Sequence, residues 1–114
     1  MKDVRWVGDS RDRVRRFPKP ARDAVGEALR IAQIGGKHRN AKPLIGVGSG
    51  VFEIVARYDT NTYRAVYTVK IGENIYVLHV FQKKSTRGIS TPKREIDLIK
   101  QRLRIVQEME GKNE

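Results

Sequence analysis

The chain has 114 residues, a length that gives one hydrophobic core and predicts a single domain. It carries 24 lysines and arginines against 13 acidic residues, and the net charge of +11 divides into +7 for residues 1–57 and +4 for residues 58–114. A surface this basic favours a phosphate-rich polymer, an acidic protein or an anionic membrane as partner. The absence of cysteine excludes disulfides and thiolate metal sites.

Other classes of protein are disfavoured by features that the sequence lacks. No apolar run approaches the roughly 20 residues that span a bilayer, and the charged start MKDVRW is not followed by the apolar core of a secretory signal. The only histidines, His38 and His79, are far apart in sequence, which argues against a zinc centre. We therefore expect a cytoplasmic protein with no membrane partner, no metal and no cofactor.

The first half of the chain predicts one short strand and two helices. Alternation over residues 4–6 indicates a brief strand, and a short basic helix follows up to Arg16. Pro20 suits the first position of a second helix, which Gly35-Gly36 ends. A basic, glycine-rich connector comes next, and its apolar pair Leu44-Ile45 is expected to begin a strand.

Three strands and two hairpins are predicted in the middle of the chain. Residues 51–58, 63–71 and 75–82 alternate with period two. Residues 59–62 and 72–74 contain the Asn, Asp and Gly that tolerate turn geometry.

A helix is expected at the end of the chain, capped by Thr91 with Pro92 at its first position. The order β-α-α-β-β-β-α predicts an α+β domain with a mostly antiparallel sheet of about four strands, two N-terminal helices and a C-terminal helix. Residues 1–110 form this single domain, and residues 111–114 are expected to be a short flexible tail.

Four basic side chains are expected at strand ends: Arg57, Arg64, Lys83 and Lys84. A nucleic-acid phosphate is the first candidate ligand for such a cluster. If the ligand were RNA cut without a metal, the site would have to stabilise a negatively charged phosphorane and support two proton transfers. Arginine grips two phosphate oxygens at once, and a lysine in a basic cluster can have a lowered pKa. The structural alternative is a solvated arginine pair bonded to Asp59 or Glu53, with lysines that discourage edge pairing.

Other residues have a functional and a structural interpretation. His79 has a pKa near neutrality, as a general base requires, but it lies mid-strand, and by parity it shares a face with Val77 and Phe81. A packed, hydrogen-bonded role is therefore expected for His79. Phe81 and Tyr67 can stack on an RNA base, and core packing is the alternative for both.

Several segments resemble the RelE/ParE superfamily of toxins from type II toxin–antitoxin pairs, and specifically its HigB-like, phage Gp49-like branch. These segments are GSGVFEIVARYD, YRAVYTV and YVLHVFQKKSTRGISTPKREIDLIKQRL. The resemblance implies a compact RelE-like sheet with helices and an endoribonuclease (mRNA interferase) that cuts mRNA on the ribosome and arrests growth. It also implies a cognate antitoxin, typically a helix-turn-helix protein.

The resemblance also implies roles for individual residues. Arg64 matches the position of a catalytic arginine and Lys84 that of a catalytic basic residue, with Lys83 beside it and Arg57 near Arg64. Further along, Lys93 and Arg87 are candidates for RNA binding, together with Phe81.

One departure from the family bears on mechanism. Well-known ribosome-dependent members place a tyrosine or histidine near the C-terminus, whereas none follows Lys84 here. Proton transfer would then fall to Lys83, Lys84 or Lys93. Two alternatives stay open, namely a ParE-like inhibitor of DNA gyrase without nuclease activity and a non-toxic basic module that binds RNA or DNA.

Overall fold

The protein is seen in a computed structural model that describes residues 1–84 and 91–111, with Lys84 described by its backbone alone. The elements in chain order are β1 (Val4–Trp6), α1 (Ser10–Arg15), α2 (Lys19–Gln33), β2 (Ala41–Pro43), β3 (Val51–Tyr58), β4 (Asn61–Thr68), β5 (Ile75–Lys84) and α3 (Lys93–Gly111).

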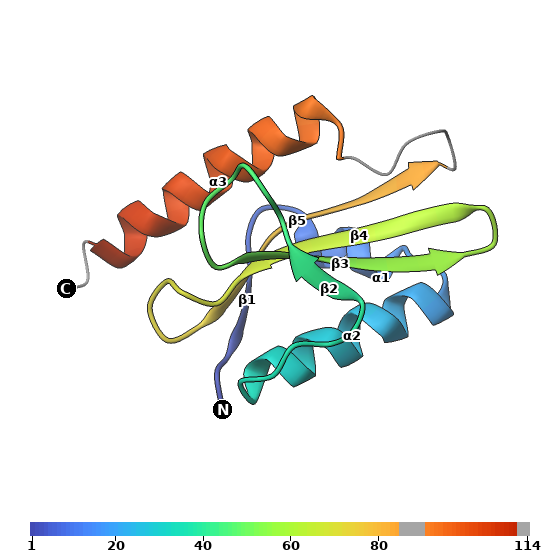
Figure 1. The fold of residues 1–114 in the computed structure, drawn as a ribbon, viewed down its shortest axis with the longest axis horizontal. Coiled ribbons are helices and arrows are strands. Elements are labelled where there is room, and N and C mark those ends of the chain that lie inside the picture. The colour runs from blue at the N-terminus through green and yellow to red at the C-terminus, as the bar shows by residue number, and fades with distance from the viewer. Residues whose placement is uncertain (85–90, 112–114) are drawn as a thin grey trace.

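Five strands form one mixed sheet in the order β1-β5-β4-β3-β2, in which β1 is parallel to β5 and every other pair is antiparallel. Figure 1 shows α3 along one side of this sheet and α2 along the other. The α+β class and the three helices are confirmed. The sheet has one strand more than expected, because β2 lies at Ala41–Pro43. The expectation of a strand start at Leu44-Ile45 is wrong, and Ile45 is 85% exposed.

The sheet separates two hydrophobic cores. Beneath it, the small apolar face of α2 packs on β3, β4 and β5 through residues such as Val25, Ala28 and Ile54. Above it, α3 contributes Ile99, Leu103 and Val106 at helical spacing. No helix within the described ranges has an apolar stretch long enough to cross a bilayer.

A bulge in β5 changes which residues face α3. Val66 pairs with His79 and Tyr67 pairs with Val77, so Leu78 has no residue opposite it. Val77 therefore packs in the core beneath the sheet, whereas Leu78 packs in the core under α3. The prediction that His79 shares a face with Val77 is wrong, because the extra residue shifts the parity.

The β3–β4 turn is tighter than predicted. Only Asp59 and Thr60 separate the two strands, and Asp59 has a φ of 58°. The strand β4 therefore begins at Asn61, and Arg64 is its fourth residue rather than a strand end.

Candidate functional site

Three successive rows of residues on the α3 side of β3, β4 and β5 contain most of the sequence-predicted basic residues. The register aligns them as Glu53–Val66–His79, Val55–Arg64–Phe81 and Arg57–Thr62–Lys83. The first row lies next to the start of α3, and the third lies at the β3–β4 turn. The first row contains the buried Glu53 and His79, whereas the third row carries the cations Arg57 and Lys83, which form an outer rim.

A buried ion pair joins two of these rows. Arg64 Nη1 donates to Glu53 Oε1 at 2.8 Å, and the two side chains are 3% and 2% exposed. The second carboxylate oxygen of Glu53 accepts a hydrogen bond from the Thr91 hydroxyl at 2.7 Å. The expectation that Arg64 is exposed at a strand end is wrong. The alternative that it bonds to Glu53 is confirmed, although the pair is buried rather than solvated.

Arg57 and Lys83 form the outer rim. Arg57 is exposed and Lys83 is half-buried, and each pairs in register with Thr62 of the strand between them. Because neighbouring strands lie about 4.8 Å apart, the backbones of Arg57 and Lys83 are about 10 Å apart. That spacing suits two cations on either side of one anionic group.

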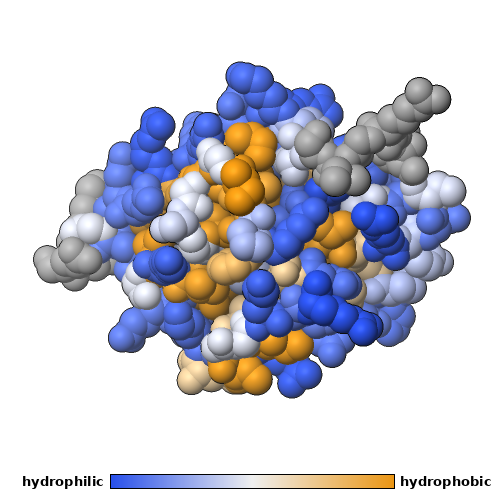
Figure 2. All heavy atoms as spheres, viewed as in Figure 1, coloured by the Kyte–Doolittle hydropathy of each residue, from blue (hydrophilic) through white to orange (hydrophobic). Residues whose placement is uncertain are grey.

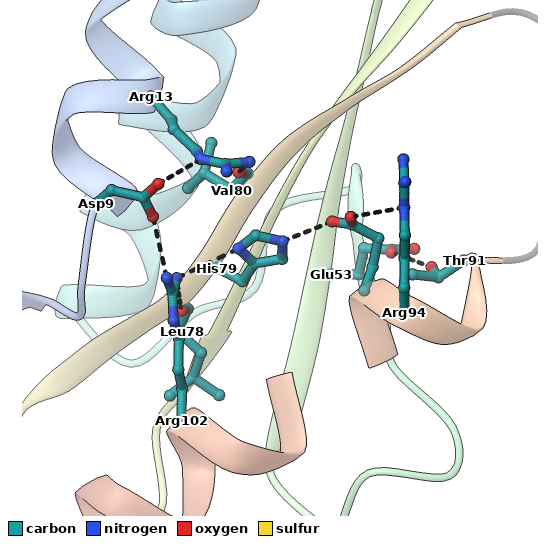
Figure 3. Close-up of polar contacts among 10 residues, drawn as sticks. Asp9, Arg13, Glu53, Leu78, His79, Val80, Thr91, Arg94 and Arg102 are labelled. Atoms are coloured by element: carbon teal, nitrogen blue, oxygen red, sulfur yellow. Dashed lines mark hydrogen bonds and ion pairs between the residues drawn. The ribbon is translucent and has the colours of Figure 1, made fainter. Parts of the chain in front are cut away.

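A second polar network surrounds His79, which is 1% exposed. Figure 3 shows His79 at the centre of these contacts, with Arg102 on one side. The Nε2 atom of His79 lies 2.5 Å from Glu95 Oε2, and Arg102 Nη1 lies 3.3 Å from Nδ1. Because Arg102 can only donate, Nδ1 is the acceptor and the ring proton is assigned to Nε2. The packed, hydrogen-bonded role expected for His79 is confirmed.

The network continues from α3 to α1. Arg102 Nη2 donates to Asp9 Oδ1 at 3.1 Å, and Arg13 Nε donates to Asp9 Oδ2 at 2.8 Å. The same arginines also cap β5 where β1 no longer pairs with it, since Arg102 donates to the Leu78 carbonyl and Arg13 to the Val80 carbonyl. Figure 3 shows these contacts running from Arg13 through Asp9 to Arg102. Both helices are thereby tied to one strand edge.

Two pKa values are shifted by this network. Burial lowers the pKa of His79, the Glu95 carboxylate opposes that effect, and the charges of Arg102 and Arg13 add to it. The hydrogen bond from Arg13 is the main cause that lowers the pKa of Asp9 to about 2, with Arg102 contributing. His79 is therefore favoured in its neutral form and Asp9 in its charged form.

A cleft opens from the surface to the buried Glu53. Its volume is about 490 Å³, and its lining includes Lys42, Ile45, Thr91 and Ile96.

Hydrophilic residues cover most of the face seen in Figure 2, and exposed hydrophobic residues gather across its middle. Within residues 1–84 and 91–111, no group of three His, Asp or Glu side chains is arranged to hold a metal ion.

Comparison with family models identifies the relatives of this chain. Residues 12–104 match the model of the phage-derived protein Gp49-like family (DUF891). The chain belongs to the Gp49-like family. This family is of the RelE/HigB toxin type, which agrees with the resemblance carried by the strand and helix motifs. Searches of curated proteins and of solved structures gave no significant match.

The Gp49-like match begins in α1 and ends in α3, so it includes all three rows. Of the predicted catalytic residues, the structure brings Arg57, Arg64 and Lys83 onto one face of adjoining strands. Lys84 pairs with Asn61 through its backbone at the end of β5, and its side chain lies outside the described part of the chain.

The three predicted RNA-binding residues have different surroundings. Lys93 is exposed at the first position of α3 and pairs with Asp97 at 3.1 Å. Phe81 is 4% exposed and stacks on His79 with ring centroids 5.2 Å apart, so its ring performs the core-packing role in this structure. Arg87 lies outside the described residues.

Sequence reasoning missed the carboxylates of this candidate site. Glu53 was considered only as a possible partner of Arg57 and Arg64, and Asp9 was given no part in the site. The available signal was Glu53 itself, an acidic residue in an otherwise apolar strand pattern of inward-facing positions. Such a residue needs a buried cationic partner.

Proposed function

We propose that the protein is the toxin of a type II toxin–antitoxin pair and acts as a ribosome-dependent endoribonuclease on mRNA. The observation that carries the proposal is the row arrangement, in which Arg57, Arg64 and Lys83 share one face of adjoining strands in a Gp49-like chain. The cognate antitoxin, a helix-turn-helix protein, holds the toxin inactive by binding it.

In this mechanism the RNA supplies its own nucleophile. The 2′-oxygen attacks the adjacent phosphorus, a P–O2′ bond forms, and the P–O5′ bond breaks to leave a 2′,3′-cyclic phosphate and a 5′-hydroxyl. A base removes the 2′ proton, and an acid protonates the departing 5′-oxygen. Lys83, Lys84 and Lys93 are the candidates for these proton transfers.

The outer rim has the chemistry to hold the scissile phosphate. Arg57 is accessible, and its planar guanidinium can donate two parallel hydrogen bonds to phosphate oxygens. Arg64 lies one row deeper with Glu53 as its partner. Because Glu53 balances its charge, Arg64 contributes as a guanidinium held in a fixed position beneath the rim and not as additional net positive charge.

Among the described residues, the site lacks an exposed strong general base, and this supports a role for the ribosome. If orientation on the ribosome supplies much of the rate, translated mRNA is a good substrate and bare RNA a poor one. Purified protein should cleave mRNA on stalled ribosomes and leave the same mRNA intact without them. Faster or equal cleavage of bare RNA would refute the dependence on the ribosome.

Expression in bacteria tests the proposal as a whole. Induction without the antitoxin should arrest growth, and mapping of mRNA 5′ ends should reveal cuts that follow the reading frame. Normal growth at high levels of the folded protein would refute the toxin assignment and favour a non-toxic basic module.

One observation favours a second candidate function. Arg64 is 3% exposed and its charge is balanced by Glu53, so it offers no free guanidinium at the surface. A protein that only binds its target, such as a ParE-like inhibitor of DNA gyrase, needs no accessible catalytic arginine. Growth arrest without any new mRNA 5′ ends, together with inhibition of supercoiling, would support that candidate.

A further inference from the structure

A basic groove lies at the other end of α3 from the candidate site. It has a volume of about 520 Å³ and lies between the 47–49 loop, the β4–β5 turn and the second half of α3. In Figure 1 these three segments lie toward the left, whereas α3 begins at the right near the end of β5. The groove is lined by Val47, Gly48, Ser49, Lys70, Ile71, Lys100, Leu103, Arg104 and Gln107.

The groove carries three exposed cationic side chains. Lys70, Lys100 and Arg104 are exposed, and none of them forms an ion pair with the described residues. No acidic residue lines the groove. The nearby Glu110 is bonded instead to the hydroxyl of Tyr76. Three cations without a carboxylate repel one another, so an anionic ligand would be bound favourably here.

The groove is also held in shape by its surroundings. Val47 is 8% exposed and packs in the same core as Leu103, which fixes the loop against α3. The stem of Lys70 lies over Gly50, where an added Cβ would come within 2.6 Å of the lysine Cγ and Cδ atoms. Lys100 and Arg104 are one helical turn apart, about 6 Å along α3. The backbone positions that carry the three cations are therefore fixed before any ligand arrives.

We propose that this groove binds the phosphodiester backbone of RNA at a distance from the scissile bond. The inference rests on the proposed function, because it gives the endoribonuclease a second contact with its RNA. Arg104 can take a phosphate bidentately, while Ser49 and Gln107 can hydrogen-bond to ribose hydroxyls or phosphate oxygens. An acidic protein helix is a poorer fit, since two of the three apolar side chains that line the groove, Val47 and Leu103, are only 8% and 7% exposed and the third, Ile71, is half-buried.

The test compares two triple variants with the same net charge. The groove variant is Lys70→Gln/Lys100→Gln/Arg104→Gln. The control is Arg11→Gln/Arg30→Gln/Arg39→Gln, which neutralises three exposed arginines that line no part of the groove. The probe is a fluorescent single-stranded RNA with 2′-O-methyl groups, which cannot be cleaved, and a hairpin of the same chemistry is used in parallel. Urea unfolding confirms that both variants are folded.

The groove variant should lower the slope of log affinity against log salt by about 2, because three contacts on a single strand each contribute about 0.7. That change corresponds to about a 100-fold loss of affinity at 0.1 M salt relative to 1 M. The control should keep the slope within about 0.5. A loss of affinity of the groove variant for either the single strand or the hairpin supports the proposal. The probe that loses affinity shows whether the groove binds single-stranded or double-stranded RNA.

Equal loss in both variants would overturn the groove as a defined site, and so would no loss in the groove variant. Weaker antitoxin binding with unchanged RNA binding would overturn it in favour of an acidic protein. These binding measurements do not depend on cleavage, so they separate the groove from the proposed activity. On ribosomes, the groove variant should raise KM and keep kcat within about twofold.

Discussion

The buried pair of Glu53 and Arg64 is the residue-scale feature with the largest consequence for experiments on this protein. Both side chains are almost inaccessible, and Thr91 occupies the remaining carboxylate oxygen of Glu53. Removal of one member of a buried ion pair leaves an unpaired charge in a medium that solvates it poorly. Loss of toxicity in an Arg64 variant would therefore reflect lost folding as well as lost catalysis.

We predict that Arg64→Ala lowers the free energy of unfolding by about 3–5 kcal/mol, because Glu53 is left buried without a cation. The measurement is equilibrium unfolding in urea. The control, Arg57→Ala, removes an exposed arginine near the β3–β4 turn. It should change the free energy of unfolding by no more than about 0.5 kcal/mol. The double variant Glu53→Met/Arg64→Leu should recover most of the loss. An unaltered urea midpoint in Arg64→Ala would show that the pair is not buried in solution.

The second residue-scale prediction concerns His79. Its pKa is lowered in the folded protein, chiefly by burial, whereas the unfolded chain has the ordinary value of about 6.5. Below about pH 6.5 the unfolded state therefore binds a proton that the folded state does not. Stability should fall as the pH decreases from 7 to 5.

His79→Gln should flatten this dependence, because glutamine cannot titrate and can still hydrogen-bond to Glu95 and Arg102. Urea midpoints between pH 5 and 7.5 provide the measurement, with His38→Gln as the control outside the network. The same slope in His79→Gln and the unmodified protein would contradict the assignment of a neutral His79.

At the scale of elements, α3 is held by polar contacts as well as by its apolar face. Arg102 reaches Asp9, the His79 ring and the Leu78 carbonyl, and its guanidinium lies where a Cβ on Gly8 would be. Gly8 has a φ of 59°, so a glycine there serves both the turn and the close approach. A single arginine thus joins α3, β5 and the β1–α1 turn.

We predict that Arg102→Met lowers stability by about 1–3 kcal/mol, because the buried Leu78 carbonyl loses its donor. Hydrogen exchange should speed up in α1 and β5 more than in β3. Arg104→Met removes an exposed arginine from the same helix and should leave both quantities nearly unchanged. Equal hydrogen-exchange rates in α1 and β5 of the Arg102→Met and Arg104→Met variants would show that Arg102 does not hold these elements together.

Sequence alone was sufficient for the elements whose signal is local. Period-two alternation predicted β3, β4 and β5, Pro20 with Gly35-Gly36 predicted α2, and Thr91-Pro92 predicted α3. The strand β2 was missed because Ala41–Pro43 is only three residues long and ends in proline, so it lacks a pattern. The burial of Arg64 was also not predicted. It depends on Glu53, a partner in the neighbouring strand, and on the shortness of the β3–β4 turn.

The site was less predictable than the fold. The bulge at Leu78 shifts the parity of β5 without any mark in the sequence, and it is the bulge that turns His79 toward α3. The network from Asp9 to Arg102 joins residues 93 positions apart. No local pattern encodes such a contact.

At the scale of the whole molecule, the positive charge is distributed over both faces, and exposed arginines line α1 and α2 as well as α3. We predict that the antitoxin associates at a rate that falls as salt increases, because long-range attraction steers an acidic partner toward a cationic surface. Stopped-flow association at several ionic strengths gives this dependence. A rate that stays constant from low to high salt would contradict steering by charge.

The parallel pairing of β1 with β5 also has a consequence for synthesis. Val4 pairs with Ile75, so β1 has no neighbouring strand until β5, the last of the five strands, has been synthesised. The core between the sheet and α3 forms later still, because α3 is synthesised after β5. Contacts between such distant segments form slowly and late. A nascent chain therefore cannot bring Arg57, Arg64 and Lys83 onto one face until most of it has been translated. Under the proposed function, this delay gives the antitoxin time to be present before the toxin has folded.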